Sequence, residues 1–174
     1  PGAEPAVPDI PGINLPNVFT VRNVSDGDRL KEYIETEEPV SAVVVGGGFI
    51  GLEMAEALRL KGVAVTVVEA DRQLMGVLDP EMAAIVQKYL QEKGVGVVLR
   101  DRLTALEGIS RVEKLILESG REIPAEMVVL AIGVKPEVRL AVEAGLAIGV
   151  TGGIQVDEYM RTSDPFIYAV GDAV

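Results

Sequence analysis

Three consecutive glycines stand where an apolar run meets a helical run, in VVVGGGFIGLEMAEAL at residues 43–58. Inside regular structure each glycine costs about 0.5–1 kcal/mol relative to alanine, so a cluster here needs a compensating role. Gly46, Gly48 and Gly51 have the spacing G-x-G-x-x-G of a dinucleotide-binding turn. In such a turn the first glycine makes the bend, the second admits a pyrophosphate, and the third lets the helix approach the strand. The motif predicts a strand, a turn and a helix whose N-terminus binds phosphate.

The segments around this turn alternate between strand-like and helix-like patterns. Three short β-branched runs are typical of parallel strands buried on both faces, at residues 41–45, 63–69 and 95–100. Two helices are expected between them, at residues 49–61 and 80–93. Asp79 and Pro80 suit the start of the second helix, and Gly62 and Gly94 suit the two C-terminal ends. With right-handed crossovers, this order predicts half of a doubly wound nucleotide-binding fold.

The rest of the chain is expected to add antiparallel and irregular structure. Residues 112–126 alternate apolar and polar side chains across a Ser119-Gly120 turn, which predicts a β-hairpin. We expect a buried strand at 127–133, a short helix from Pro136 to Ala144, and short strands near 153–156 and shortly before Asp172. The predicted fold class is α/β, a Rossmann-like parallel sheet with an antiparallel β-hairpin or meander insertion.

The N-terminal part has two interpretations. Residues 1–17 are rich in proline, which argues against a helix or a central strand. They suit an extended connector, with a disordered tail as the alternative. A helix is expected from Gly27 to Thr36, capped by Ser25 or Asp26.

An acidic residue is expected at the tip of the second strand. Glu69 follows Gly46 by 23 residues, close to the separation of about 20 at which a carboxylate reaches the adenosine ribose. A carboxylate there accepts hydrogen bonds from the ribose hydroxyls and repels a 2′-phosphate, which favours NAD over NADP. Arg72 lies just beyond it and could accommodate a 2′-phosphate, so NADP is less favoured without being excluded.

Two residues beside the glycine turn have ordinary explanations in the pattern alone. Phe49 suits a core aromatic, and Glu53 suits an acidic residue in the first turn of a helix. Neither a P-loop nor a G-x-S-x-G motif is present. A Rossmann-like methyltransferase stays open, although Val45 stands where such enzymes usually have an acidic residue.

Composition restricts the chemistry of the chain. Its 174 residues include no cysteine and no histidine, and the net charge is −11. Disulfides and thiol chemistry are excluded within the chain, and a transition-metal site or a Ser-His relay is not expected. The acidic balance argues against a nucleic-acid partner. No apolar run reaches about 18 residues and no signal peptide opens the chain, so we expect a cytoplasmic location and no membrane partner.

Four segments in this order resemble the FAD-dependent pyridine nucleotide-disulfide oxidoreductases: VVVGGGFIGLEMAEAL, VTVVEA, VVLAIGVKPE and TSDPFIYAVGDA. The likeness is greatest to the branch of coenzyme A disulfide reductase, NADH oxidase and NADH peroxidase. In that family the NAD domain is inserted into the FAD domain. The resemblance therefore implies a fragment, with a connector from the FAD domain at 1–22, an NAD(P)-binding domain at 23–150, and a truncated return segment at 151–174.

The resemblance also implies an activity for the full-length parent. Such a parent passes hydride from NADH to FAD and on to a disulfide or oxygen-type acceptor, and is expected to be a homodimer. The fragment is expected to bind NADH without catalysis, because the first FAD glycine motif and any reactive cysteine lie outside it. A ferredoxin- or rubredoxin-reductase-like parent and a stand-alone nucleotide-sensing module are the alternatives.

Site residues follow from the resemblance by position. Gly133 matches a glycine near the nicotinamide-side ribose, Phe49 an aromatic that covers the flavin, Glu53 an acid beside the nicotinamide, and Asp172 the acid that holds the ribityl chain. No catalytic or metal-binding residue is expected. The full set of predicted cofactor-binding residues is Gly46, Gly47, Gly48, Phe49, Ile50, Gly51, Glu53, Glu69, Ala70, Arg72, Ile132, Gly133 and Asp172.

Overall fold

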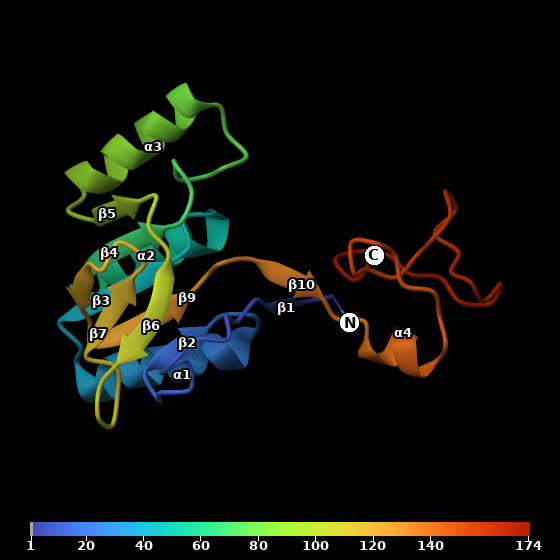
Figure 1. The fold of residues 1–174 in the computed structure, drawn as a ribbon, viewed down its shortest axis with the longest axis horizontal. Coiled ribbons are helices and arrows are strands. Elements are labelled where there is room, and N and C mark those ends of the chain that lie inside the picture. Colours follow the sequence, from blue (N-terminus) through green and yellow to red (C-terminus); the bar gives the residue numbers. More distant parts are fainter. Residues whose placement is uncertain (1) are drawn as a thin grey trace. The chain divides into compact units, whose positions relative to one another are not determined.

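The computed structural model describes residues 2–174 and divides them into two compact units (Figure 1). One unit is Val7–Gly133, and the other joins the N-terminal residues up to Ala6 with Val134–Val174. Pro1, the first residue of the predicted connector, lies outside the described residues. The domain limits at residues 22 and 150 stay a prediction about the parent protein.

A five-stranded parallel sheet forms the centre of the Val7–Gly133 unit. Its order is β2-β9-β3-β4-β5, and each neighbouring pair runs parallel. Most of its residues are valine, leucine or another apolar type, as expected for strands covered on both faces. The strands are β2 (Val18–Thr20), β3 (Ser41–Val45), β4 (Ala64–Glu69), β5 (Gly96–Leu99) and β9 (Met127–Leu130).

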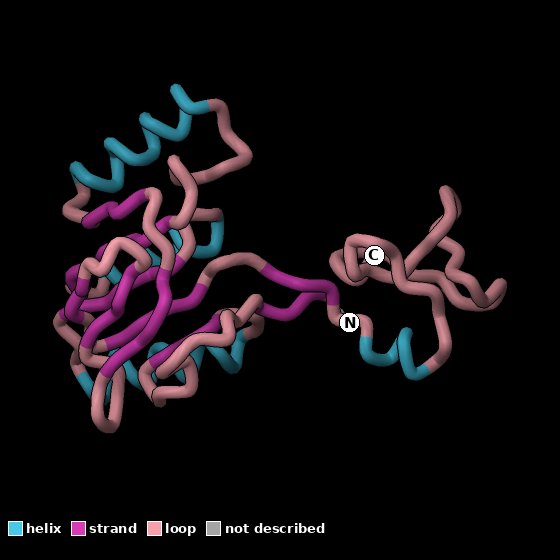
Figure 2. The backbone as a smooth tube through the Cα atoms, viewed as in Figure 1, coloured by secondary structure: helices cyan, strands magenta, loops and turns pink. Residues whose placement is uncertain are grey.

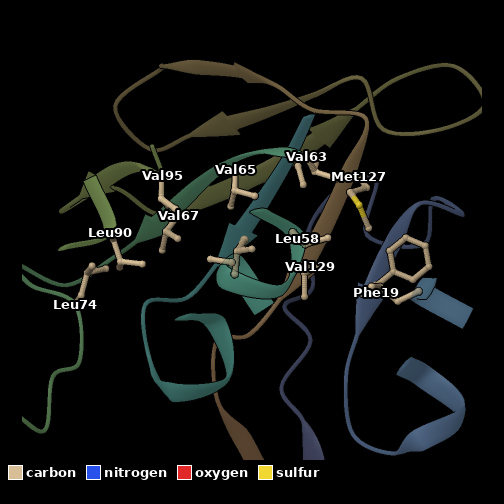
Figure 3. Close-up of a cluster of buried hydrophobic side chains, with 14 residues drawn as sticks. Phe19, Leu58, Val63, Val65, Val67, Leu74, Leu90, Val95, Met127 and Val129 are labelled. Atoms are coloured by element: carbon tan, nitrogen blue, oxygen red, sulfur yellow. The ribbon is translucent and has the colours of Figure 1, made fainter. Parts of the chain in front are cut away.

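Alternate residues of these strands enter two separate cores. Ala42 and Val44 of β3 pack in a cluster with the helices, whereas Val43 and Val45 pack in a second cluster on the other face. Figure 3 shows the helix-side cluster. The helices are α1 (Val24–Glu37), α2 (Phe49–Leu60) and α3 (Pro80–Glu92). The second cluster is covered by an antiparallel sheet of β6 (Leu103–Glu107), β7 (Lys114–Leu117) and β8 (Glu122–Pro124).

The handedness of crossovers explains this three-layer arrangement. The connections through α1, α2 and α3 all move across the sheet in one direction, from β2 to β3, then β4, then β5. Right-handed crossovers in one direction place every helix on the same face. The chain then returns from β5 to β9, on the opposite side of β3, so its right-handed connection lies on the other face. That connection contains the antiparallel sheet.

Most of the alternating pattern is confirmed, with two differences near the N-terminus. The strands and helices around the glycine turn are present, and β7 and β8 form the expected hairpin. α1 begins earlier than expected, because Asn23, and neither Ser25 nor Asp26, is the N-cap. Asn23 and Asp26 exchange side-chain to backbone hydrogen bonds as a capping box. β2 was not expected, since three residues are too short for a periodic signal.

Asn17 fastens the segment before β2 to the body of the unit. This side chain is 1% exposed. Its amide nitrogen donates to the carbonyls of Val112 (3.0 Å) and Glu126 (2.7 Å), and its oxygen accepts from the Val112 amide (2.6 Å). Ile10, Ile13 and Leu15 pack against the second core, so the disordered-tail interpretation is wrong for this segment.

The second unit is mostly irregular (Figure 2). It contains β1 (Ala3–Pro5), antiparallel to β10 (Val134–Pro136), and α4 (Arg139–Glu143). The expected helix start at Pro136 is wrong, because Pro136 is the last residue of β10 and takes part in the ladder. The strands expected near 153–156 and before Asp172 are also wrong, since only isolated bridges occur, at Ile148–Ile154 and Arg161–Tyr168.

No helix within residues 2–174 has the combination of length and apolar character that a bilayer crossing requires.

The Asn17 contacts predict a large effect of their removal. Asn17→Ala removes three hydrogen bonds to the backbone and leaves the amide and carbonyl of the buried Val112 without these partners, whereas the Glu126 carbonyl keeps its bond from the Tyr33 hydroxyl (3.0 Å). We therefore expect the free energy of unfolding to fall by about 2–4 kcal/mol. Urea unfolding followed by circular dichroism of the helices measures it. Asn14→Ala, on an exposed residue of the same segment, is the control and should change it by less than about 0.5 kcal/mol. Equal effects of the two variants would contradict the role of Asn17.

Asp101 predicts a pH dependence of stability. Its carboxylate is 8% exposed and accepts from the Ser119 hydroxyl (2.6 Å) and the Ser119 amide (3.1 Å). The hydroxyl bond holds the pKa of Asp101 below its ordinary value. A lowered pKa stabilises the fold above the unfolded-state pKa, near 3.9, and this effect is lost as pH falls through the folded-state value. Ser119→Ala should therefore destabilise the protein most near neutral pH.

The measurement is urea unfolding of the wild type and Ser119→Ala between pH 7 and pH 3. The difference in the free energy of unfolding between the two proteins should become smaller below about pH 4. The exposed control Ser110→Ala should have a free energy of unfolding close to that of the wild type at every pH. A difference independent of pH would show that the hydroxyl does not act through the carboxylate.

Candidate nucleotide-binding site

The glycine turn lies at the carboxyl end of β3, directly before α2. Gly46 has φ = +110°, a conformation that favours glycine. A Cβ built on Gly46 would overlap the carbonyl oxygen of Ala131, which follows β9. Gly51 lies in the first turn of α2, where a Cβ would overlap the carbonyl oxygen of Gly46. Both positions therefore exclude side chains, so that α2 can begin close against the edge of the sheet.

Gly48 differs from these two glycines because its missing side chain faces open space. No atom lies within 4 Å of a Cβ built there. Gly48 is also the N-cap of α2, and no side chain caps this helix end. The first N–H groups of a helix have no partner within the helix, so those of α2 remain available to an acceptor beside Gly48. This arrangement suits an anionic group such as a diphosphate.

Glu69 ends β4 and turns its carboxylate toward the glycine turn. β4 pairs with β3 in parallel register, with Val68 opposite Val45, and the Gly46 amide donates to the Val68 carbonyl (2.8 Å). The Glu69 carboxylate accepts from the amides of Gly47 (2.6 Å) and Asp71 (2.8 Å). These two bonds hold the half-buried carboxylate beside the turn.

The side chains at the start of α2 are exposed. Phe49 is 62% exposed and Ile50 is 42% exposed, so the interpretation of Phe49 as a core aromatic is wrong. Glu53 is an exposed residue and the fifth of α2, beyond the first turn, so its interpretation as a first-turn acid is also wrong. The roles that the resemblance implies for Phe49 and Glu53 both require exposure.

The other predicted residues fall into two groups. The Ala131 amide donates to the Val45 carbonyl (2.7 Å), which brings the end of β9, with the exposed Ile132 and Gly133, beside the glycine turn. The exposed Ala70 and Arg72 follow Glu69. Asp172 is exposed and belongs to the other unit.

Two residues outside the predicted set also contact the turn. Leu74 is fully buried, and a Cβ on Gly47 would overlap its Cδ2 atom. The amide of Met75 donates to the Gly47 carbonyl (2.8 Å). Leu74 is one of several apolar residues in this loop, so the sequence did not single it out, and a backbone contact such as that of Met75 leaves no signal in the sequence.

The comparisons with known proteins agree on one family. The model of the pyridine nucleotide-disulphide oxidoreductases matches residues 1–174. An NADH oxidase of Methanocaldococcus jannaschii is 46% identical over 174 residues, covering 99% of this chain and 38% of that protein. A rubredoxin-NAD(+) reductase of Pseudomonas putida is 42% identical over 163 residues, covering 92% of this chain and 41% of that protein.

A solved structure gives the same result. The NAD-dependent persulfide reductase from A. fulgidus has a TM-score of 0.94 and 46% identity, covering 99% of this chain and 32% of that one. The chain thus spans less than half the length of each of these relatives. The expected α/β fold with a parallel sheet and antiparallel strands is confirmed, and a methyltransferase is excluded. By its match over the whole chain, this protein belongs to the pyridine nucleotide-disulphide oxidoreductase family.

Proposed function

We propose that the Val7–Gly133 unit binds NAD(H) for a larger flavoprotein oxidoreductase that transfers hydride from NADH to FAD. The observation that carries this proposal is the position of the Glu69 carboxylate, which accepts from the Gly47 amide within the turn. A pyrophosphate would lie on the open side of Gly48, at the uncapped start of α2. Glu69 would then accept hydrogen bonds from the hydroxyls of the adenosine ribose.

The residues around the turn fit a dinucleotide. Gly46, Gly48 and Gly51 combine a tight bend, an open face and a close helix contact. Ile132 and Gly133, beside the turn at the end of β9, would lie toward the nicotinamide half, together with Phe49 and Glu53. A negative charge at Glu69 favours NAD over NADP, whereas the exposed Arg72 after it leaves room for weaker NADPH binding.

Asp172 and the flavin belong to the proposal for the parent protein. Large apolar side chains of the second unit are exposed, with Phe166 at 91% and Tyr168 at 61%. This exposure supports a return segment that packs on a further domain. In the parent, FAD would accept hydride when the two ring systems are held about 3–3.5 Å apart, so the chain's contribution is positioning. A cytoplasmic location and a homodimeric parent stay predictions.

The three relatives described above are named for oxidase, rubredoxin reductase and persulfide reductase activities, at 42–46% identity to this chain. A nucleotide-binding unit common to such different enzymes supplies the electron donor. We propose a disulfide or oxygen-type acceptor for the parent, and a reactive cysteine upstream of this chain would distinguish it from a ferredoxin- or rubredoxin-reductase-like enzyme.

Glu69→Ala tests the nucleotide site. Loss of charge-assisted hydrogen bonds to the ribose should weaken NADH binding by about 1.5–3 kcal/mol, or roughly 10- to 150-fold. NADPH should lose less, because the 2′-phosphate is no longer repelled. Calorimetric titration with both nucleotides measures these changes.

The control for this titration is Glu56→Ala, which removes the same charge from an exposed position of α2. It should leave both affinities within about twofold, a change of about 0.4 kcal/mol. If Glu69→Ala binds the two nucleotides as the wild type does, the assignment of Glu69 to the ribose is wrong.

The chain by itself should bind NADH without oxidising it. Hydride transfer requires the flavin beside the nicotinamide, and we assign the flavin to the parent. Absorbance at 340 nm should stay constant when NADH is mixed with this chain, with or without added FAD, at a protein concentration that binds most of the nucleotide. Steady oxidation above the rate of FAD alone would contradict this expectation.

A further inference from the structure

Gly47 is the one glycine of the turn that the G-x-G-x-x-G motif does not require. Its φ lies outside the left-handed region, so the backbone alone would accept a side chain at this position. The position is nevertheless closed, because a Cβ there would overlap Cδ2 of Leu74 and lie 3.2 Å from Oε2 of Glu69. Residue 47 is therefore restricted to glycine by the side chains packed against it, and its backbone conformation does not require glycine.

Leu74 has little freedom to move away. It is 0% exposed and belongs to the buried cluster on the helix side of the parallel sheet (Figure 3). Interiors of this kind are close-packed, so a shift of one side chain requires shifts of others. Leu74 is thus a buried apolar side chain that packs against Gly47 and has little freedom to move.

The loop that carries Leu74 is also tied to the turn by its backbone. The Met75 amide donates to the Gly47 carbonyl (2.8 Å). The loop is closed on itself, because the Leu78 amide donates to the Met75 carbonyl (2.8 Å) and the Gln73 side chain donates to the Leu78 carbonyl (2.9 Å). This loop therefore contacts Gly47 in two ways, through the Leu74 side chain and through the Met75 amide.

The Glu69 carboxylate lies within the same assembly. The Gly47 amide donates to it, while the Gly47 carbonyl accepts from Met75. A displacement of Gly47 by Leu74 would therefore move the carboxylate and the start of α2 relative to each other. These are the two groups that a dinucleotide has to contact at once, through its ribose and its pyrophosphate.

We propose that Leu74 is a positioning residue for the nucleotide site, which sets the distance between the glycine turn and the Glu69 carboxylate and requires glycine at residue 47. The inference rests on the proposed NAD(H) binding. In this inference Leu74 does not contact the nucleotide, but it affects the affinity through the position of the glycine turn.

The test uses NADH titration calorimetry on Gly47→Ala, Leu74→Ala and the double variant, each shown to be folded by circular dichroism. Gly47→Ala should weaken NADH binding at least fivefold, because the new methyl group displaces the turn. Leu74→Ala should weaken it severalfold, because the turn loses its support. The double variant should bind at least threefold more tightly than Gly47→Ala, because the methyl group then occupies the space left by the leucine.

Two controls separate this contact from other effects of alanine. Gly76→Ala lies in the same loop, where a Cβ has open space, and should stay within twofold of the wild type. Gly48→Ala should weaken binding by crowding the nucleotide itself, and Leu74→Ala should not rescue it. Leu74→Val replaces Leu74→Ala throughout if the alanine variant does not fold.

The outcomes distinguish the two proposals. Failure of the wild type to bind NADH would overturn the proposed function and this inference together. If the wild type binds but Gly47→Ala binds as tightly, or if the two losses multiply in the double variant, only the inference is overturned. Variants that lower the urea midpoint while the folded protein keeps its affinity would show a merely structural role and would also overturn it.

Discussion

The close approach of the glycine turn to the end of β9 is the constraint on which the candidate site depends. Gly46 lies against the Ala131 carbonyl, and Gly51 lies against the Gly46 carbonyl, with no space for a Cβ at either position. Two absent side chains therefore let α2 begin at the sheet edge, beside the strand that brings Ile132 and Gly133. The N-terminus of α2, the Glu69 side chain and the end of β9 lie close together there, because the neighbouring parallel strands β9, β3 and β4 end at the same edge of the sheet.

The arrangement of layers follows from strand order more than from local sequence. Each step from β2 to β5 moves the same way, so its helices share a face, and the return to β9 places the antiparallel sheet on the other. The parallel strands are thereby buried on both sides without a second layer of helices.

The sequence predicted the parts of the fold that repeat a periodic signal. The β3-α2-β4-α3-β5 run, the hairpin and the location of Glu69 followed from burial patterns, caps and spacing. β2 and β10 were missed because strands of three residues have almost no periodicity, and Pro136 was read as a helix start although it ends a strand. Contacts such as Leu74 with Gly47 depend on tertiary packing, and pattern reasoning has no access to them. Phe49 was wrongly predicted to be a core residue because aromatic side chains are usually buried, whereas this one is exposed.

The Asn17 contacts have a consequence for the order in which the chain is synthesised. Asn17 hydrogen-bonds to Glu126, 109 residues later, and within residues 2–174 β2 pairs only with β9. A nascent chain therefore carries β2 and one edge of β3 unpaired until residues 126–130 have left the ribosome. During that interval the unpaired edge of β3 is open to mispairing with other chains, and the parallel sheet is complete only when β9 enters between β2 and β3.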